Sequence, residues 1–300
     1  MAVDVRSTPS PSRGITFSID PGEVVGFIGP NGAGKTTTLK ILSGLLMPTS
    51  GSARVGNFIP GQRKKGFLKS IGAVMGKRSQ LWWELDAYNA VHLVATAYGV
   101  PESRFRKRFD MMVSLLGVSH LADQPVRNLS LGERMKFELA ASLIHGPSVL
   151  FLDEPTLGLD LVSQRNLRQF IVDCNREFGT TVLLTSHYLA DVETVCPRTL
   201  IIREGLLTYD GYLQDLRHIS ARKRVCIAGR QDVQEFGRLG LEWVSGRSEW
   251  QGTVDPDSLG HLFRIAGELG DVNLTVEDPP LEDVIALIYQ GGEVSGGVFH

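Results

Sequence analysis

A glycine-rich turn that ends in Lys35 and Thr36 carries the clearest chemistry in this sequence. The turn fits the pattern GxxxxGK[ST] and lies between an apolar, strand-like run and a helix-like run that includes Leu39. Glycines allow successive backbone N–H groups to point into one hollow, and the following helix N-terminus adds partial positive charge. A lysine there can reach the β- and γ-phosphates of a nucleotide, and a threonine hydroxyl can bind Mg²⁺. The pattern therefore predicts a polyphosphate site made by Gly29, Pro30, Asn31, Gly32, Ala33, Gly34, Lys35, Thr36 and Thr37.

Further polar residues follow two other predicted strands. Asp153 and Glu154 come at the end of the apolar run Val149–Leu152, and His187 comes after Thr181–Thr185. An Asp-Glu pair can simply cap a helix, and a lone histidine is more often structural than catalytic. Ligands of parallel sheets bind at the carboxyl ends of the strands, where all these residues and the phosphate-binding turn would meet. That convergence favours a catalytic site.

A second helix start that could bind an anion lies at Asn128–Arg134. Ser130 and Glu133 match the capping-box pattern, which accounts for both residues without any function. Gly132 and the exposed hydroxyl of Ser130 at a helix N-terminus would also suit an anion. This site is far in sequence from the phosphate-binding turn, and one ATP does not obviously need both.

The order of strand and helix patterns indicates a parallel α/β sheet that is interrupted by helices. Strand patterns such as Ile71–Met75 lie on either side of the segment from Asp86 to Ile144, which has almost only helix patterns. Within it, Glu102–Gly117 places apolar residues on one face, as expected for a core-facing helix. A long helix is predicted at Leu161–Phe178, and residues 1–13, rich in Ser, Pro and Arg, are expected to be disordered.

The last part of the chain has a different pattern and predicts a small separate domain. Its strands and helices alternate as β-α-β-β-α-β, which is the ferredoxin-like arrangement, and a final helix follows Pro279-Pro280. The predicted strands are Arg224–Ile227, Leu241–Val244, Glu249–Val254 and Val272–Val276, and the predicted helices are Gln231–Arg238, Asp257–Gly267 and Leu281–Tyr289.

Composition limits the class of protein. The formal charge of −2 argues against a nucleic-acid partner, because proteins that bind nucleic acid usually carry a basic excess. The three cysteines are far apart, so neither a zinc site nor a disulfide framework is suggested. No apolar run approaches the roughly 18 residues that span a bilayer. If the protein serves a membrane process, we expect another chain to supply the membrane part.

Over residues 14–205 the motifs resemble, in type and order, those of the ATP-binding cassette (ABC) ATPases. Gly29–Thr37 is similar to the Walker A motif, Leu129–Glu133 to the LSGGQ signature, Val149–Asp153 to Walker B, Leu159-Asp160 to the D-loop and His187 to the switch histidine. The resemblance implies an α/β P-loop NTPase fold with an inserted helical subdomain at about 77–147. Together with the C-terminal pattern it implies a nucleotide-binding domain over residues 1–217 and a small α+β, ferredoxin-like domain over 218–300.

The resemblance also implies roles for the motif residues. In this family two nucleotide-binding domains pack head to tail, and each ATP lies between one domain's phosphate loop and the other's signature helix. Asp153 and Thr36 would then hold Mg²⁺, Glu154 would polarise the water that attacks the γ-phosphate, and His187 would contact that phosphate, with Lys35 as a further catalytic cation. The residues expected to complete the partner's site are Ser130, Gly132, Glu133 and Asp160.

Several positions depart from the family's pattern. Leu131 stands where glycine is usual, and Glu133 stands where glutamine is usual. The family's glutamine loop supplies a Gln beside the metal; here Lys77 occupies the aligned position and Gln80 lies nearby, so we expect Gln80 to substitute or the coupling to differ. The family also has an extra N-terminal strand and an aromatic residue that stacks on adenine. This chain begins too late for either, Phe17 belongs to the following strand, and we expect a missing N-terminal segment or weak base stacking.

The C-terminal part resembles drug- and ion-export ABC ATPases, in which the cassette is a separate subunit and the tail carries a motif like LEDVF, here Leu281–Ile285. This implies an ATP-hydrolysing subunit at the cytoplasmic face of the membrane, with a second copy of itself and an integral membrane permease as partners. Trp82 and Trp83 cannot both face one helix core, so at least one is expected to contact the permease. The alternatives are a soluble ABC-type ATPase and a low-turnover nucleotide-binding regulatory module. Neither the transported substrate nor the role of the C-terminal domain follows from the sequence.

Overall fold

The computed structural model describes residues 2–6, 14–76, 79–219, 222–229, 233–270 and 272–290. These residues form two compact units, Met1–Gly211 (unit 1) and Tyr212–His300 (unit 2). The division falls a few residues before the boundary predicted at 217. All the predicted site residues belong to unit 1.

A six-stranded sheet forms the centre of unit 1, in the order β5-β6-β7-β3-β8-β9. The pairs β5–β6, β6–β7, β7–β3 and β3–β8 are all parallel. Every residue of β6 and β7 is buried, as expected for strands that have both faces covered. The strands are β3 Val24–Ile28, β5 Ile71–Met75, β6 Val149–Asp153, β7 Thr181–Thr185, β8 Arg198–Arg203 and β9 Leu206–Tyr212.

A second, antiparallel sheet of unit 1 contains β1 Val3–Arg6, β2 Phe17–Ile19 and β4 Ser52–Val55. The prediction that residues 1–13 are disordered and that the family's extra strand is missing is therefore wrong for Val3–Arg6. Val3 and Val5 are buried because β1 pairs with β2 on one side and β4 on the other. Residues 7–13 lie outside the described residues. Phe17 lies in β2, as predicted, where it packs against Phe27 with ring centroids 5.9 Å apart.

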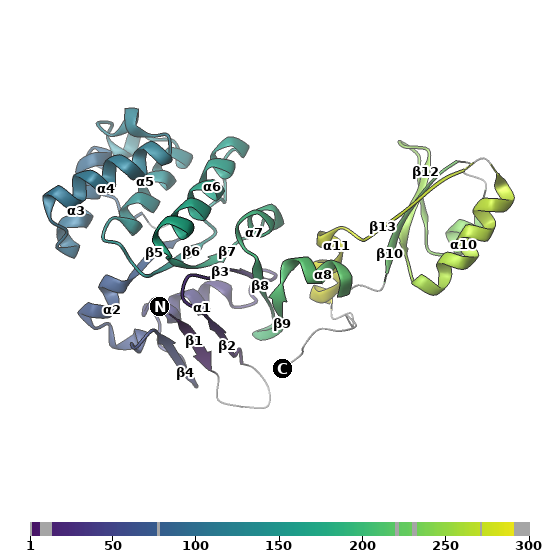
Figure 1. Ribbon diagram of the computed structural model, residues 1–300, viewed down its shortest axis with the longest axis horizontal. Coiled ribbons are helices and arrows are strands. Elements are labelled where there is room, and N and C mark those ends of the chain that lie inside the picture. Colours follow the sequence, from purple (N-terminus) through teal and green to yellow (C-terminus); the bar gives the residue numbers. More distant parts are fainter. Residues whose placement is uncertain are drawn as a thin grey trace. The chain divides into compact units, whose positions relative to one another are not determined.

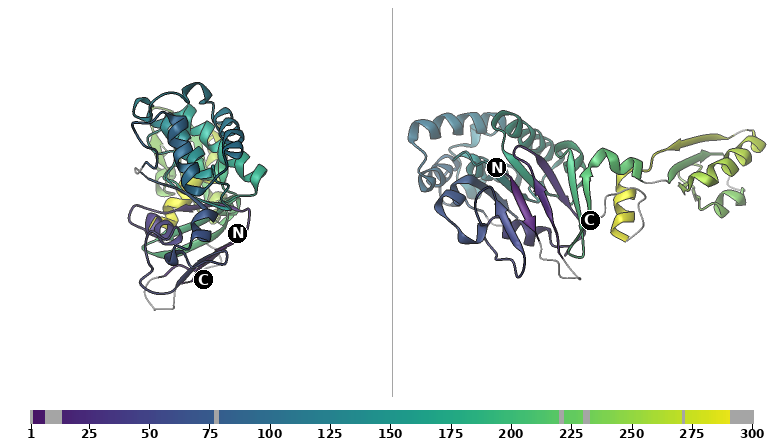
Figure 2. Two further views of the ribbon diagram at one scale, coloured as in Figure 1. Left: turned by 90° about the vertical axis from the view of Figure 1, so that its left-hand side faces the viewer. Right: turned by 60° about the horizontal axis from the view of Figure 1, so that its bottom comes forward.

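Helices cover both faces of the six-stranded sheet. Helix α1 lies between this sheet and the small sheet, and α6 and α7 lie on the opposite side (Figure 1). The helical subdomain, α3 to α5, gathers at one end of unit 1 (Figure 2). The predicted apolar face of α4 is buried at Phe105, Phe109 and Met112. The helices are α1 Lys35–Leu42, α2 Lys65–Ser70, α3 Ala87–Tyr98, α4 Glu102–Leu115, α5 Leu131–Leu143, α6 Leu161–Phe178 and α7 Leu189–Val195.

Unit 2 contains a four-stranded antiparallel sheet in the order β11-β12-β10-β13. The element order β-α-β-β-α-β confirms the predicted ferredoxin-like arrangement. Its core includes Val225, Phe236, Trp250 and Leu262. None of the helices within the described ranges is long and apolar enough to cross a bilayer. The elements are α8 Leu213–Ile219, β10 Lys223–Ala228, α9 Gln234–Arg238, β11 Glu242–Val244, β12 Glu249–Val254, α10 Pro256–Leu269, β13 Asn273–Glu277 and α11 Leu281–Gln290.

Candidate active site

The phosphate loop joins β3 to α1 and opens at an uncapped helix N-terminus. Gly34 precedes α1 with φ 114° and no side-chain cap, so the first N–H groups of the helix remain available for a ligand. A Cβ at Gly29 would overlap the backbone of Ile202, which explains why a glycine stands there. Lys35 is buried and folds back over the loop, where its Nζ donates to the carbonyl oxygens of Gly29 (2.6 Å) and Pro30 (3.1 Å). The ammonium group thus already lies within the phosphate-binding turn.

The pKa of the Lys35 ammonium is lowered overall, as the net result of two opposing effects. Burial lowers the pKa of the Lys35 ammonium, whereas the nearby carboxylates of Glu154 and Asp153 raise it. A cation in this setting is poorly hydrated and interacts more strongly with a phosphate than it would in water.

Hard oxygen donors for a divalent cation gather at the ends of α1 and β6. The Thr36 hydroxyl donates to Asp153 Oδ1 at 3.1 Å, and the Thr185 hydroxyl donates to the same oxygen at 2.8 Å. A hydroxyl and a carboxylate beside a phosphate loop are the oxygen ligands that Mg²⁺ prefers. The residues present therefore fit a magnesium ion.

The predicted general base and the predicted switch histidine contact each other. His187 Nε2 lies 2.6 Å from Glu154 Oε1, although the two residues are far apart in sequence. Glu154 has φ 54°, which is uncommon for a residue other than glycine. Its backbone N–H donates to Thr185, and its carbonyl accepts from Leu157 N–H at 3.2 Å. The structure thus places Lys35, Thr36, Asp153, Glu154 and His187 in one group, at the carboxyl ends of β3, β6 and β7.

The signature residues form a second group, at the start of α5. The predicted capping box is present: Glu133 N–H donates to Ser130 Oγ at 3.3 Å, and Ser130 N–H donates to Glu133 Oε2 at 2.8 Å. The bonds from Ser130 hold the pKa of the Glu133 carboxyl below its usual value. Gly132 packs so closely on Ser163 of α6 that a Cβ would lie 2.8 Å from its Oγ, with Asp160 Oδ2 at 3.8 Å.

Asp160 caps α6 beside the signature turn. Its Oδ1 accepts from the N–H groups of Val162 (3.0 Å) and Ser163 (2.9 Å), and its Oδ2 accepts from the Ser163 hydroxyl (2.7 Å). The hydrogen bonds from Ser163 lower the pKa of the Asp160 carboxyl. The D-loop aspartate and the signature glycine are therefore neighbours within one chain.

The structure places Gln80 against α5. Its Nε2 donates to the carbonyl of Glu138 at 3.0 Å, and its N–H donates to the Glu138 carboxylate at 3.2 Å. Glu138 is buried, and this burial raises the pKa of its carboxyl group. The role of Gln80 beside the metal stays a prediction, and Lys77 lies outside the described residues. Glu138, Ser79, Asp153 and Glu154 line a common pocket of about 600 Å³.

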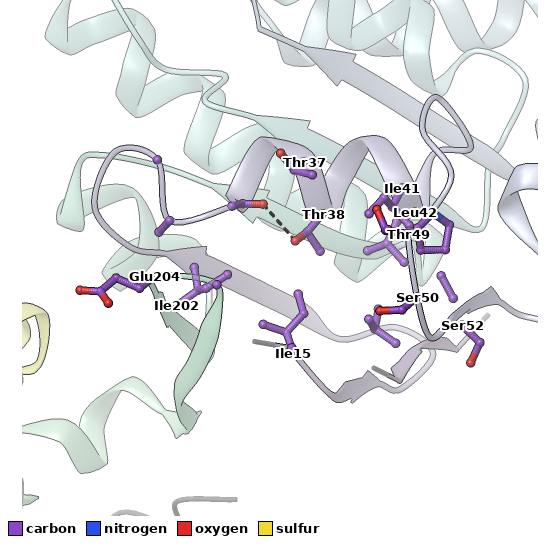
Figure 3. A pocket seen from close by; sticks show the side chains of 18 residues that line it. Ile15, Thr37, Thr38, Ile41, Leu42, Thr49, Ser50, Ser52, Ile202 and Glu204 are labelled. Carbon is purple, nitrogen blue, oxygen red and sulfur yellow. Dashed lines mark hydrogen bonds between the residues drawn. The ribbon is translucent and has the colours of Figure 1, made fainter. Parts of the chain in front are cut away.

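A second pocket, of about 620 Å³, opens beside the phosphate loop and is lined by aliphatic and hydroxyl side chains. Figure 3 shows Thr37, Thr38 and Ile41 along α1, above Ile15 and Ile202. The described residues that line it include no aromatic side chain. Weak base stacking, expected from the sequence, stays a prediction.

Four further residues support the catalytic group and were not predicted from the sequence: Thr185, Ser186, Asp191 and Arg168. Thr185 contacts both Asp153 and Glu154, and the neighbouring Ser186 donates to the buried Asp191 of α7. Thr156 also donates to Asp191, and Arg168 Nε of α6 lies 2.6 Å from its Oδ1. The sequence did contain a hint of Thr185 and Ser186, since they stand with His187 as three consecutive polar residues at the end of a strand.

This fold and this geometry define a class of protein, the P-loop enzymes that hydrolyse nucleoside triphosphates. The family model "ABC transporter" matches residues 12–157. The linearmycin resistance ATP-binding protein LnrL of Bacillus subtilis (strain 168) is 33% identical over 204 residues, which cover 68% of this chain and 65% of that protein. The ABC transporter ATP-binding protein NatA of the same strain is 32% identical over 213 residues, which cover 71% of this chain and 86% of NatA.

A solved structure is similar over the same region. The structure of cbiO1 from Clostridium perfringens, part of the ABC transporter complex cbiONQ, is 30% identical, has a TM-score of 0.62, and is matched over 71% of this chain and 89% of that chain. This chain belongs to the ATP-binding subunits of ABC transporters, and it is an ATPase of that family.

Proposed function

We propose that this chain powers an exporter through a separate membrane permease, as a head-to-tail dimer that binds ATP between its two copies. The observation that carries the proposal is that two helix starts of unit 1 carry different groups, although residues at both starts, including Thr36 and Leu131, line one pocket. The ammonium of Lys35 and the carboxylates of Asp153 and Glu154 lie together near the start of α1. Ser130 and Gly132 lie at the start of α5, beside the D-loop.

The first group accounts for ATP binding and hydrolysis. The N–H groups of the loop and the Lys35 ammonium bind the phosphates, and Thr36 and Asp153 hold Mg²⁺. Bound Mg²⁺ neutralises charge that develops on the phosphate oxygens. Glu154 orients and polarises the attacking water, and His187 is close enough to Glu154 to act on the same phosphate.

The second group accounts for dimerisation. Ser130 and the Gly132 N–H bind the γ-phosphate held by the partner copy, Glu133 maintains the turn through its capping bonds, and Asp160 lies at the seam. Each γ-phosphate then bridges two copies. Hydrolysis removes the bridge and reopens the pair, so ATP drives a conformational population shift.

The permease contact is proposed at the segment that follows the glutamine loop. Trp82 and Trp83 are 63% and 52% exposed, and large exposed aromatic side chains are typical of protein interfaces. Either Lys77 or Gln80 couples this surface to the metal side of the site. This contact would hold the subunit at the cytoplasmic face of the membrane. The export direction is supported by the motif Leu281–Ile285 and by the relative LnrL, which is named for linearmycin resistance.

The test is ATPase activity of the purified chain, with and without liposomes that hold the integral membrane protein encoded beside it. We expect measurable basal turnover that the permease changes by several-fold. A turnover that no membrane protein alters would favour a soluble ATPase, and a near absence of turnover would favour the low-turnover regulatory module. Replacing Trp82 and Trp83 by alanine should weaken permease capture, whereas replacing the exposed Phe178 should not.

A further inference from the structure

Thr185 is the last residue of β7 and lies between the two carboxylates of the catalytic group. It is fully buried, and it is in parallel register with Asp153 of β6 and Phe27 of β3. The adjacent strands therefore bring a hydroxyl to the end of the strand that carries Asp153 and Glu154. Its position follows from the sheet order, since β6 and β7 are separated in sequence by the whole of α6.

The hydroxyl of Thr185 makes a hydrogen bond in each direction. It donates to Asp153 Oδ1 at 2.8 Å and accepts from the backbone N–H of Glu154 at 3.1 Å. The same N–H also reaches the Thr185 carbonyl oxygen at 3.0 Å. One side chain thus ties the predicted metal ligand to the backbone of the predicted general base.

Glu154 needs such support because of its backbone conformation. Its φ of 54° lies in the left-handed region, which a side chain with a Cβ adopts only when surrounding contacts enforce it. The Thr185 hydroxyl and carbonyl hold the amide end, and Leu157 N–H holds the carbonyl end at 3.2 Å. This conformation directs the Glu154 side chain to His187, 2.6 Å away.

Asp153 Oδ1 receives a second hydroxyl, from Thr36 at 3.1 Å. The two donors differ in what else they can do. Thr36 would also offer its hydroxyl oxygen to the metal, so it would serve two partners. Thr185 belongs to a buried strand and can keep its bond throughout.

We propose that Thr185 is a positioning residue for ATP hydrolysis. Its hydroxyl fixes the Asp153 carboxylate and the Glu154 backbone relative to each other, and it does not act on the nucleotide itself. This inference rests on the proposed ATP hydrolysis at this site. It does not depend on the permease or on the direction of transport.

The experiment compares Thr185→Val, which keeps the shape and removes the hydroxyl, with Thr185→Ser, which keeps the hydroxyl. Thr199→Val is the matched control. Thr199 is equally buried, on β8 of the same sheet, and its Oγ1 has no hydrogen-bond partner among the described residues. Removing that hydroxyl should therefore cost nothing at the site.

For Thr185→Val we expect kcat to fall about tenfold to hundredfold, as for the loss of hydrogen bonds to a buried charged group, while KM for ATP stays within about twofold. Thr185→Ser and Thr199→Val should stay within about threefold of the wild type in kcat. The second readout is calorimetric binding of a non-hydrolysable ATP analogue with and without Mg²⁺. Thr185→Val should reduce the gain in affinity that Mg²⁺ provides by several-fold, because Asp153 is no longer held.

The proposal is overturned if Thr185→Val keeps the wild-type kcat, if Thr185→Ser loses as much as Thr185→Val, or if Thr199→Val loses as much. Thermal unfolding of each variant shows whether the fold is kept; if the valine variant does not fold, Thr185→Ala takes its place with the same expectations. If none of the proteins, including the wild type, hydrolyses ATP, the proposed function itself fails. If the wild type hydrolyses ATP and Thr185→Val equals it, only this inference fails.

Discussion

Two helix N-termini in unit 1, those of α1 and α5, could each bind an anion, but they differ in how their first N–H groups are satisfied. Helix α1 begins after Gly34 with no side-chain cap, and the Lys35 ammonium lies within the turn. Helix α5 begins with a complete capping box, in which Ser130 and Glu133 satisfy each other's backbone N–H groups. The first start is open to a ligand, whereas the second is satisfied by its own side chains.

Under the proposed two-copy arrangement, the two helix starts belong to different halves of one site, a catalytic half at α1 and a recognition half at α5. Around the start of α1, residues from three parallel strands meet the helix. The carboxylates of Glu154 and Asp153 lie near enough to raise the pKa of the Lys35 ammonium against the effect of burial. At the start of α5, Gly132 lies against Asp160 and Ser163 at the start of α6, and Leu131 lines the pocket that Asp153 and Glu154 also line.

The largest effect that would test the catalytic half is the loss of its general base. Glu154→Gln should lower kcat by about 10²–10⁴-fold, because the amide cannot polarise the attacking water. ATP binding should be kept, since the phosphate loop is unchanged. Steady-state ATPase rates and calorimetric ATP binding check both parts, with the exposed Glu177→Gln on α6 as the control. Unchanged turnover would remove Glu154 from this role.

The ATP affinity of the open helix start at α1 should depend on the charge of Lys35. Lys35→Met keeps the length of the side chain and removes its ammonium group, so ATP affinity should fall about tenfold to hundredfold, as for a lost charge-assisted hydrogen bond. Lys40→Met, an exposed position on the same helix, should leave the affinity within about twofold. Equal effects of the two changes on calorimetric binding would contradict the role of Lys35.

The recognition half can be disturbed through its close contact with α6. In Gly132→Ala the new Cβ would lie 2.8 Å from Ser163 Oγ, so the signature turn must shift. We expect ATP binding to one chain to persist and kcat to fall roughly tenfold, because the γ-phosphate of the partner copy is held less well. Ser163→Gly should restore part of the rate in the double variant. Gly260→Ala, where a Cβ meets nothing within 4 Å, is the control, and an equal loss there would contradict this account.

The smallest effect concerns the charge in the capping box. The folded pKa of Glu133 is lowered, so its ionised form contributes stability that is present above the ordinary value of 4.5 and is lost as pH falls through the lower, folded value. Glu133→Gln should lower stability by less than about 1 kcal/mol at neutral pH. The difference in unfolding free energy between the two proteins should shrink below pH 4.5; a difference that does not change with pH would contradict the charged cap.

Local patterns in the sequence predicted the parts of the site that depend on neighbouring residues. The phosphate loop, the capping box at Ser130 and the strand that ends at Asp153 are each specified within a few residues, and the structure has them. The strand Val3–Arg6 was missed, because a four-residue strand followed by Ser and Pro carries little periodicity and is stabilised only by pairing with β2 and β4.

The rule for parallel sheets predicted that the strand-end residues of the site would meet, but it did not predict which of them contact each other. The pairing of β6 with β7, which brings Thr185 to Asp153 and His187 to Glu154, depends on which strands become neighbours in the sheet. The position of Gln80 against Glu138 likewise depends on the packing of α5. Periodicity predicts that such elements exist, whereas their adjacency is decided by tertiary packing.

The central claim, that one chain holds only half of each working ATP site, is tested most directly by molar mass in solution. Glu154→Gln should be measured by light scattering after size exclusion, with Mg²⁺ and with or without ATP. The account predicts that ATP doubles the molar mass and that adding Gly132→Ala lowers the fraction of protein at the doubled mass. A Glu154→Gln protein that binds ATP and remains a monomer would contradict it.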